Sequence, residues 1–410
     1  MPTDPTSDLT IPPALRPFIG KGEFRDRSWW RTEGDEITYV PPTVPPAAPR
    51  ILPLGHPAAY EASEELVAAV ETALLLRKPL LVTGKPGTGK TELAERIAYE
   101  FDLGPVLRFE AQSLSEANDL FYRFDHIGQL IAAKLVEGQR GRPEDADVMN
   151  FVQYGPLGKA ILRSMPGLEG KLLDEARKMT ASRFVSLAAQ AGGKALVDVS
   201  VEALRADADA DADEPSHRPV PKPAQRSVVL IDEIDKASRD FPNDLLNGID
   251  RMDFRLRELG SRAVRGAGRD SDFHPIVVVT SNSERDLPHP FMRRCVFAHI
   301  RDPDRAQMAA IVRKRVFGDA AVPPEGRDGL PPLYSRLLDA FLDLRDGNEL
   351  RYPIGTSEFL DLALVARRQG IAGFDASPAV IERLQRSIGA IAKHPRDSEL
   401  VLARFAALAS

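Results

Sequence analysis

Several features are scarce or absent in this sequence of 410 residues, and each absence excludes a class of protein. The single cysteine, Cys295, excludes a disulfide within the chain and fits a reducing compartment. The formal net charge is −6, so the chain lacks the overall basic charge that attracts nucleic acid. No apolar run is long enough to cross a bilayer, and the first residues lack the segments of a secretory signal. These absences predict a soluble, cytoplasmic protein whose partners include neither nucleic acid nor a membrane.

Signatures of two common kinds of catalytic site are missing as well. The seven histidines form no His-x-x-x-His pair and have no cysteine partner set, which argues against a zinc site. The Gly-x-Ser-x-Gly signature of a nucleophilic serine does not occur. With 43% apolar and 28% charged residues, the composition is that of an ordinary globular chain with room for two or three domains.

The sequence does contain a glycine-rich loop, between a strand-like run at 79–83 and a helical pattern at 92–98. The residues of this loop are Gly84, Lys85, Pro86, Gly87, Thr88, Gly89, Lys90 and Thr91. Glycines let successive backbone N–H groups turn inward onto a β-phosphate at a helix N-terminus, where the helix dipole also favours an anion. In such a loop Lys90 reaches the β- and γ-phosphates, and the Thr91 hydroxyl holds Mg2+. The loop therefore predicts a bound nucleoside triphosphate; a glycine-rich turn without a ligand is the alternative.

Apolar runs in the rest of the chain predict a parallel sheet. The runs at 227–231 and 275–280 are rich in β-branched residues, which is typical of strands covered on both faces. Further candidate strands lie at 106–109 and 296–300, and helical patterns separate them, so the predicted class is α/β. From about residue 303 the strands stop, and amphipathic patterns predict helices at 333–346, 357–368 and 378–393.

These patterns divide the chain into three predicted parts: a proline-rich N-terminal arm at 1–60, an α/β nucleotide-binding domain at 61–302 and a helical domain at 303–410. The arm offers one strand-like piece, at 36–40, and its two tryptophans are interpreted as packing residues. Alternating aspartate and alanine near 205–226 lack the glycine and terminal glutamate of a calcium loop. This segment is therefore interpreted as a solvated linker.

Two carboxylates, Asp232 and Glu233, end a buried strand-like run. In a phosphate-loop enzyme an aspartate at this place binds Mg2+ through water, and the adjacent glutamate polarises the water that attacks the γ-phosphate. Asp235 is interpreted as a solvated or helix-capping carboxylate. Asn282 follows the next buried run, and we expect it beside the γ-phosphate and the attacking water. A lone asparagine there is also typical of a turn.

Two arginines, Arg293 and Arg294, stand between a short helical stretch and the last predicted strand. They could merely neutralise a helix C-terminus. They could also reach the nucleotide of a neighbouring subunit, where a guanidinium stabilises the charge that develops during phosphoryl transfer. The residues alone leave both interpretations open.

The order of these features, from the phosphate-binding loop to a helical lid, resembles the AAA+ ATPases. The narrower resemblance is to their MoxR-like branch, and it rests on the stretches 119–125, 154–160 and 280–288. It covers roughly residues 60–400, which leaves the N-terminal arm outside it. The implied fold is a P-loop NTPase AAA+ core, a parallel sheet between helices, with a C-terminal all-α lid.

The resemblance also implies roles for the residues already named. Asp232 and Glu233 take the Walker B roles, with Mg2+ held by Thr91 and Asp232, and Asn282 takes the sensor-1 role. Arg294 is the first choice for an arginine finger that acts on a neighbouring subunit, and Arg293 is the second. The nucleotide implied is ATP.

Two regions depart from the family pattern. The lid often carries a sensor-2 arginine early in one helix, but Glu358 stands roughly at that place, so Arg351 is only a candidate. Residues 154–160 are expected in an insertion within the second helix, near a central pore or partner surface. The segment 163–226 enlarges this insertion.

By this resemblance the protein is an ATP-hydrolysing ring, expected to be a hexamer, that remodels a protein client in the manner of a chaperone, with a von Willebrand A-type protein as a candidate partner. A second hypothesis is a nucleic-acid motor related to the GTP-dependent restriction translocases, which the acidic charge balance argues against. A third is a nucleotide-gated switch that hydrolyses slowly; the intact carboxylate and arginine pairs argue against it.

Overall fold

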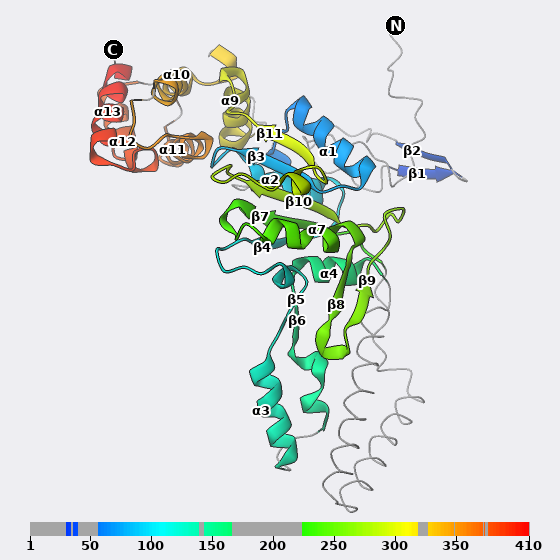
Figure 1. Ribbon diagram of the computed structural model, residues 1–410. Helices are drawn as coiled ribbons and strands as arrows, with labels where there is room; N and C mark the ends of the chain where they lie inside the picture. The colour runs from blue at the N-terminus through cyan, green and yellow to red at the C-terminus, as the bar shows by residue number, and fades with distance from the viewer. Residues whose placement is uncertain are drawn as a thin grey trace, which may run out of the picture.

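The computed structural model describes residues 30–33, 36–39, 56–138, 143–165, 224–318, 327–347, 349–371, 373 and 376–409. Its centre is a five-stranded parallel sheet with the strand order β11-β3-β10-β7-β4 (Figure 1). The strands are β3 (Leu80–Gly84), β4 (Leu107–Glu110), β7 (Val228–Asp232), β10 (Ile276–Ser281) and β11 (Val296–Ile300). Each begins within one residue of its predicted start, so the predicted α/β class and parallel sheet are confirmed.

Two hydrophobic clusters cover the two faces of the sheet. Along β7, Val229 and Ile231 belong to one cluster, whereas Val228 and Leu230 belong to the other. Because successive strand residues point to opposite faces, a continuous apolar run is what a strand covered on both sides needs. This explains why β3 and β10 are buried at every position.

Among the described residues, helices cover both faces of the sheet. On one face lie α1 (Glu64–Leu76) and α2 (Lys90–Glu100), and on the other lie α4 (Pro156–Arg163) and α7 (Phe241–Arg251). Most of α4 is buried in the sheet-facing cluster, so residues 156–160 belong to a core layer rather than to the predicted insertion. Helix α1 begins after Ser63, whose hydroxyl accepts a hydrogen bond from the Leu66 N–H.

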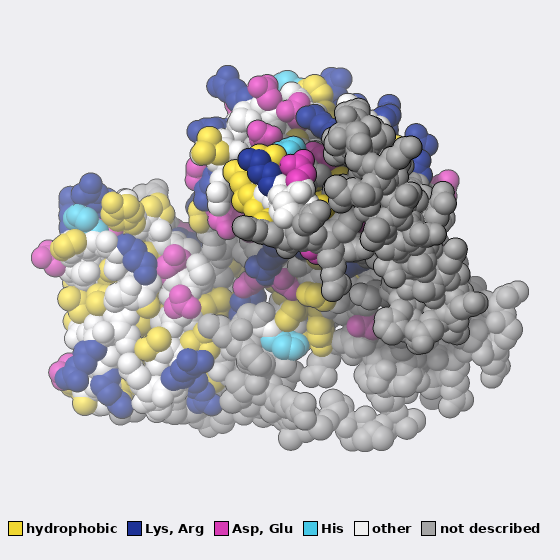
Figure 2. All heavy atoms as spheres, turned by 90° about the horizontal axis from the view of Figure 1, so that it is seen from below, with side chains coloured by type: hydrophobic (Ala, Val, Ile, Leu, Met, Phe, Trp, Pro, Cys, Tyr) yellow, Lys and Arg dark blue, Asp and Glu magenta, His cyan; other side chains and the backbone are white. Residues whose placement is uncertain are grey.

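A second group of elements extends away from the sheet on the side of β4 (Figure 1). It consists of β5 (Tyr122–Phe124) paired with β6 (Val152–Tyr154), helix α3 (His126–Glu137), and the hairpin of β8 (Asp253–Leu256) and β9 (Arg262–Arg265). No residue of α3 is buried. Figure 2 views the molecule from this end, where apolar side chains are visible at the surface. On α3 the large exposed ones are Ile127, Leu130, Ile131 and Leu135.

The described residues of the C-terminal region form helices joined by loops and contain no strand. It contains α9 (Arg305–Val312), which continues as a π-helix (Arg313–Phe317), α10 (Pro332–Asp346), α11 (Thr356–Arg368), α12 (Pro378–Gln385) and α13 (Pro395–Ala406). These helices share a separate hydrophobic cluster. The helical C-terminal region is thus confirmed, although the helix predicted at 378–393 ends at Gln385. None of the described helices is long and apolar enough to cross a membrane.

The described part of the predicted arm includes a hairpin of β1 (Trp30–Glu33) and β2 (Glu36–Tyr39). The strand predicted at 36–40 is therefore present, and its partner was missed. Of the predicted linker at 205–226, only residues 224–226 are described. The three domain boundaries stay predictions.

Candidate functional site

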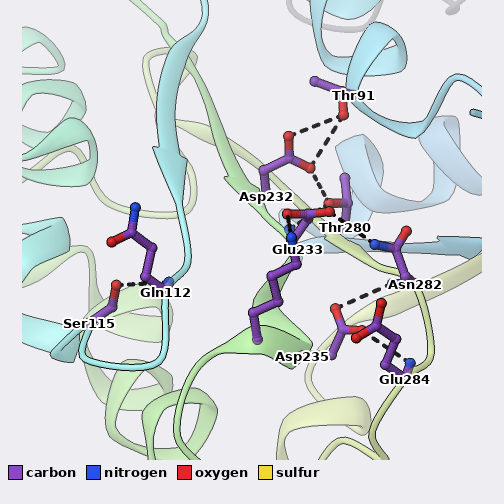
Figure 3. Close-up of polar contacts among 10 residues, drawn as sticks. Thr91, Gln112, Ser115, Asp232, Glu233, Asp235, Thr280, Asn282 and Glu284 are labelled. Carbon is purple, nitrogen blue, oxygen red and sulfur yellow. Dashed lines mark hydrogen bonds and ion pairs between the residues drawn. The ribbon is translucent and has the colours of Figure 1, made fainter. Parts of the chain in front are cut away.

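The phosphate-binding loop, the carboxylate pair and Asn282 meet at one edge of the sheet. Strand β10 lies between β3 and β7, and all three run in the same direction. The register pairs Ser281 with Thr83 and Val279 with Ile231, so the carboxyl ends of these strands lie level. The residues that follow the strands are consequently neighbours, as their positions at strand ends predicted (Figure 3).

The phosphate-binding loop has the backbone that its glycines predicted. Gly87 and Gly89 have φ angles of 76° and 84°, in the left-handed region that glycine adopts without strain, and α2 begins at Lys90. Lys90 is 7% exposed, and its ammonium donates to the carbonyl oxygens of Gly84 and Lys85, each at 2.8 Å. Burial lowers the pKa of Lys90, and nearby carboxylates, led by Asp232, act in the opposite direction. The loop thus places N–H groups and one cation at a helix start, as phosphate binding needs.

Two oxygen-bearing side chains lie beside this loop. The Thr91 hydroxyl donates to the two carboxylate oxygens of Asp232 at 3.1 and 3.3 Å (Figure 3). Hydroxyl and carboxylate oxygens are hard ligands of the kind that Mg2+ prefers. The donor set formed by Thr91 and Asp232 therefore fits the metal that the sequence predicted.

Thr280 connects the carboxylate pair to β10, a role that the sequence analysis did not predict. Its hydroxyl donates to Asp232 and accepts a hydrogen bond from the Glu233 N–H at 2.9 Å. The side chain is fully buried at the end of an apolar strand. The only signal in the sequence was a polar residue near the end of an apolar run. Its partners, Asp232 and Glu233, lie at the end of β7, 48 and 47 residues earlier in the chain.

Both carboxylate oxygens of Glu233 are engaged. Oε1 accepts a hydrogen bond from the Asn282 amide at 3.0 Å, and Oε2 is paired with the ammonium of Lys236. This pairing raises the pKa of Lys236. Glu233 has a φ angle of 54°, which is uncommon for a residue with a side chain. Glu233 and Asn282, which the sequence placed only near the attacking water, are thus bonded to each other, and the contact with Lys236 was not predicted.

Asp235 is not the solvated or helix-capping carboxylate that the sequence suggested. Its side chain is 4% exposed, and it accepts hydrogen bonds from the backbone N–H groups of Asn282 and Glu284, at 3.3 and 3.1 Å (Figure 3). It therefore binds the loop that follows β10. Sequence spacing could not show this, because the contact depends on the pairing of β7 with β10.

Arg293 and Arg294 lie at the opposite edge of the sheet. The following strand, β11, pairs in parallel with β3, and the Val296 N–H donates to the Pro79 carbonyl at 2.8 Å. The whole of β3, roughly 13 Å at about 3.3 Å per residue, separates this edge from the phosphate-binding loop. Arg294 is half-exposed and forms an ion pair of 2.8 Å with Asp250. The structure therefore does not bring either arginine to the loop of its own chain.

The helical C-terminal region reaches the phosphate-binding loop through a serine. A Cβ atom placed on Gly87 would lie 2.4 Å from the Ser357 hydroxyl, at the start of α11. An ion pair of 2.7 Å between Arg315 and Glu92 also joins the two regions, and Lys85 of the loop pairs at 2.7 Å with Asp302, just before the helical region. Ser357 was missed because its place depends on how the two regions pack.

The structure shows no arginine directed at the phosphate-binding loop at either position considered for sensor 2, Glu358 or Arg351. The Glu358 carboxylate accepts hydrogen bonds from the Gly355 N–H and the Ser357 hydroxyl, each at 3.0 Å, at the start of α11. The Arg351 guanidinium lies 3.2 Å from His394, and its backbone N–H donates to Asp397. Arg351 is thus engaged with the start of α13 rather than with the loop.

These observations define the class of the protein first. A parallel sheet, a phosphate-binding loop between β3 and α2, and carboxylates at the end of β7 are the parts of a P-loop nucleoside triphosphatase. The family is given by the comparison with known proteins. The model of the AAA domain, dynein-related subfamily, matches residues 79–295, which is slightly more than half of the chain. The chain therefore belongs to this AAA family, whose members bind and hydrolyse nucleotides with a divalent metal.

Other comparisons add little to this assignment. No curated protein matches the chain. A solved structure described as the structure of C. elegans PCH-2 is 15% identical, over 80% of this chain and 59% of that chain, with a TM-score of 0.25. The chain therefore spans less than two thirds of that protein, and a TM-score this low supports no statement about activity or assembly.

Proposed function

We propose that this protein is a MoxR-like AAA+ ATPase that assembles into a ring of six subunits and hydrolyses ATP at sites shared between neighbours. The observation that carries the proposal is the division of the polar residues between two edges of one sheet. Glu233 and Asn282 lie with the phosphate-binding loop at the carboxyl edge, and Arg294 lies at the amino edge. A chain that holds both halves at opposite ends needs a neighbour to join them.

In this proposal the carboxyl edge binds the substrate. The N–H groups of residues 84–91 and the Lys90 ammonium bind the phosphates of ATP. Thr91 and Asp232 would hold Mg2+, which offsets the negative charge of the phosphate oxygens when it is bound. The Thr280 hydroxyl, which bonds to the Asp232 carboxylate and to the Glu233 N–H, holds that carboxylate and the Glu233 backbone in place.

The same edge activates water. Of Asp232 and Glu233, only Glu233 is bonded to the side-chain amide of Asn282. We therefore assign Glu233 as the general base and Asn282 as the group that orients it. Because Lys236 engages the second oxygen of Glu233, we propose that Lys236 releases that oxygen when the site is filled. Glu233 can then accept the proton of the attacking water.

The amino edge acts on the neighbouring subunit. A guanidinium that reaches the γ-phosphate stabilises charge in the transition state and raises turnover by about 10³- to 10⁵-fold in related enzymes. Arg294 is half-exposed, so it can leave Asp250 for a more negative partner. Arg293 lies beside it and is also exposed, so it is the second candidate.

We further propose that the work of the ring is done on a protein client, with a von Willebrand A-type protein as a candidate partner. The resemblance to the MoxR-like branch and the acidic charge balance support this assignment. Capture by Glu233→Gln in ATP tests it, because a ring stalled with ATP is expected to keep its client, whereas Lys90→Ala under the same conditions is the matched control. A partner retained equally by both variants would contradict the assignment.

Turnover measured against protein concentration tests the enzymatic proposal. The full chain is assayed with ATP and with GTP, with and without DNA, while its mass is followed by light scattering. We expect ATP turnover per subunit to rise as rings form and DNA to leave it unchanged. Equal turnover by the monomer would refute the shared site. Stimulation by DNA with a preference for GTP would instead support a nucleic-acid motor.

A further inference from the structure

The loop that follows β10 is held by side chains at three consecutive positions. The N–H groups of Asn282 and Glu284 donate to the two carboxylate oxygens of Asp235, at 3.3 and 3.1 Å. Between them, the Ser283 N–H donates to the Ser281 hydroxyl at 3.0 Å. Ser283 has a φ angle of 59°, a conformation that a residue with a side chain adopts only when its surroundings hold it there. These contacts determine the path of the loop.

Asp235 is buried at a cost that these bonds offset. Its side chain is 4% exposed, and among the described residues it forms no ion pair. A carboxylate removed from water is strongly destabilising unless its oxygens are bonded, and bonds from N–H groups to a charged oxygen are about twice as strong as neutral ones. Each oxygen of Asp235 accepts one N–H, so an isosteric amide, with one acceptor and one donor group, cannot replace it.

The loop bound by Asp235 is the one that carries Asn282. The Asn282 amide donates to Glu233 at 3.0 Å, and Glu233 precedes Asp235 by two residues. Asn282 thus joins the turn after β7 to the loop after β10 twice, through its backbone N–H to Asp235 and through its side-chain amide to Glu233 (Figure 3). A change at Asp235 moves the backbone from which the amide reaches Glu233.

We propose that Asp235 is a positioning residue for hydrolysis, which fixes the Asn282 amide against Glu233 by binding the loop backbone on either side of Ser283. The inference rests on the proposed function, because it concerns the same reaction. The hydrogen bonds of Asp235 go to the loop after β10 and not to the phosphate-binding loop. It acts on turnover through Asn282 and leaves binding of ATP to the loop.

Kinetics of Asp235→Asn test this role. We expect kcat to fall about tenfold, with KM for ATP within about twofold of the original chain, because one of two charge-assisted bonds is lost. Asp240→Asn, the same change at an exposed carboxylate nearby, is the matched control and should leave both constants unchanged. If Asp235→Asn does not fold, Asp235→Ser carries the same test, since its hydroxyl can still accept one N–H.

A double-mutant cycle separates positioning from a general loss of structure. If Asp235 acts through Asn282, Asp235→Asn should lower kcat no further in an Asn282→Ala background. An equal tenfold loss in both backgrounds would overturn the inference, and would leave the proposed function intact as long as Glu233→Gln abolishes turnover.

Hydrogen exchange gives a readout that does not depend on activity. In the full chain, Asp235→Asn should increase the exchange of the Glu284 amide, and Asp240→Asn should not. Unchanged exchange would overturn the inference even if turnover falls. A chain that hydrolyses no nucleotide but shows the expected exchange would overturn the proposed function and leave the loop contact standing.

Discussion

The two edges of the central sheet satisfy their charged groups in different ways. At the carboxyl edge, buried or half-buried side chains bond to one another within one chain, from Thr91 through Asp232 and Thr280 to Glu233 and Asn282. At the amino edge, the guanidiniums of Arg269 and Arg294 share a single carboxylate, Asp250, and both remain nearly half-exposed. The polar groups of the first edge are bonded within one chain, and the second edge presents cationic groups outward.

In the proposed function, this difference means that one chain contributes halves of two different sites. The carboxyl edge is preorganised, so a substitution there should change chemistry within the subunit. The amino edge is available to another molecule, so a substitution there should act on a neighbour. The predictions below, from the largest expected effect to the smallest, test whether this distinction holds.

The largest effect is expected at the carboxyl edge, from Glu233→Gln. Loss of the general base should lower kcat about 10³-fold, while ATP binding persists because the phosphate-binding loop is unchanged. Steady-state turnover and titration with a fluorescent ATP analogue measure the two quantities. Glu284→Gln, an exposed carboxylate in the next loop, is the control. Turnover at the original rate in Glu233→Gln would contradict the assignment of Glu233 as the general base.

Acid should destabilise the fold through a buried group near the amino edge. His274 is 3% exposed, and burial among Arg77, Arg226 and Arg269 holds its pKa at about 4. In the unfolded chain His274 is protonated near pH 6.5, whereas in the folded chain it stays neutral down to about pH 4. The free energy of unfolding therefore decreases as pH falls from about 6.5 to 4. The loss should reach roughly 3 kcal/mol.

Urea unfolding at a series of pH values measures this loss. His274→Asn should flatten the dependence on pH in this range, whatever its own stability, whereas His289→Asn, an exposed histidine, should leave the dependence as it was. An unchanged slope in His274→Asn would mean that other groups carry the acid sensitivity.

Arg294→Ala should lower kcat by about 100-fold, since Arg293 remains beside it, and should change ATP affinity only a few-fold. Both values come from turnover and binding titrations at a concentration at which rings form. Arg404→Ala removes an arginine of similar exposure from the C-terminal region and serves as the control. A loss of ATP affinity as large as the loss of turnover would place Arg294 in its own chain's binding site.

The smallest effect is expected from Lys236→Met, which frees one oxygen of Glu233. We expect kcat to rise about two- to fourfold, because Glu233 no longer has to break an ion pair before it accepts a proton. The carboxylate raises the pKa of the Lys236 ammonium, so the pair persists at neutral pH and the rise should be equal between about pH 6 and 9. A fall in kcat would instead show that Lys236 assists the base.

The sequence predicted those parts of the site that depend on one strand at a time. The loop at 84–91, the pair Asp232 and Glu233, and Asn282 each follow a strand-like run, and parallel pairing brings such ends together. Residues that work across strands escaped notice. Thr280 and Asp235 have partners that only the register of β7 with β10 reveals. Ser357 could not be predicted, because its place beside the phosphate-binding loop depends on how α11 packs against that loop.

Mixing two inactive variants tests the central claim, that each site is shared between neighbours. Glu233→Gln subunits bind ATP and present Arg294, and Arg294→Ala subunits keep Glu233. Where an Arg294→Ala loop meets a Glu233→Gln neighbour, the site is complete. Each variant alone should be nearly inactive, and an equimolar mixture should recover up to about a quarter of the original turnover by random assembly. Recovery should fail when the double variant replaces Glu233→Gln. A mixture no more active than its components would contradict the shared site.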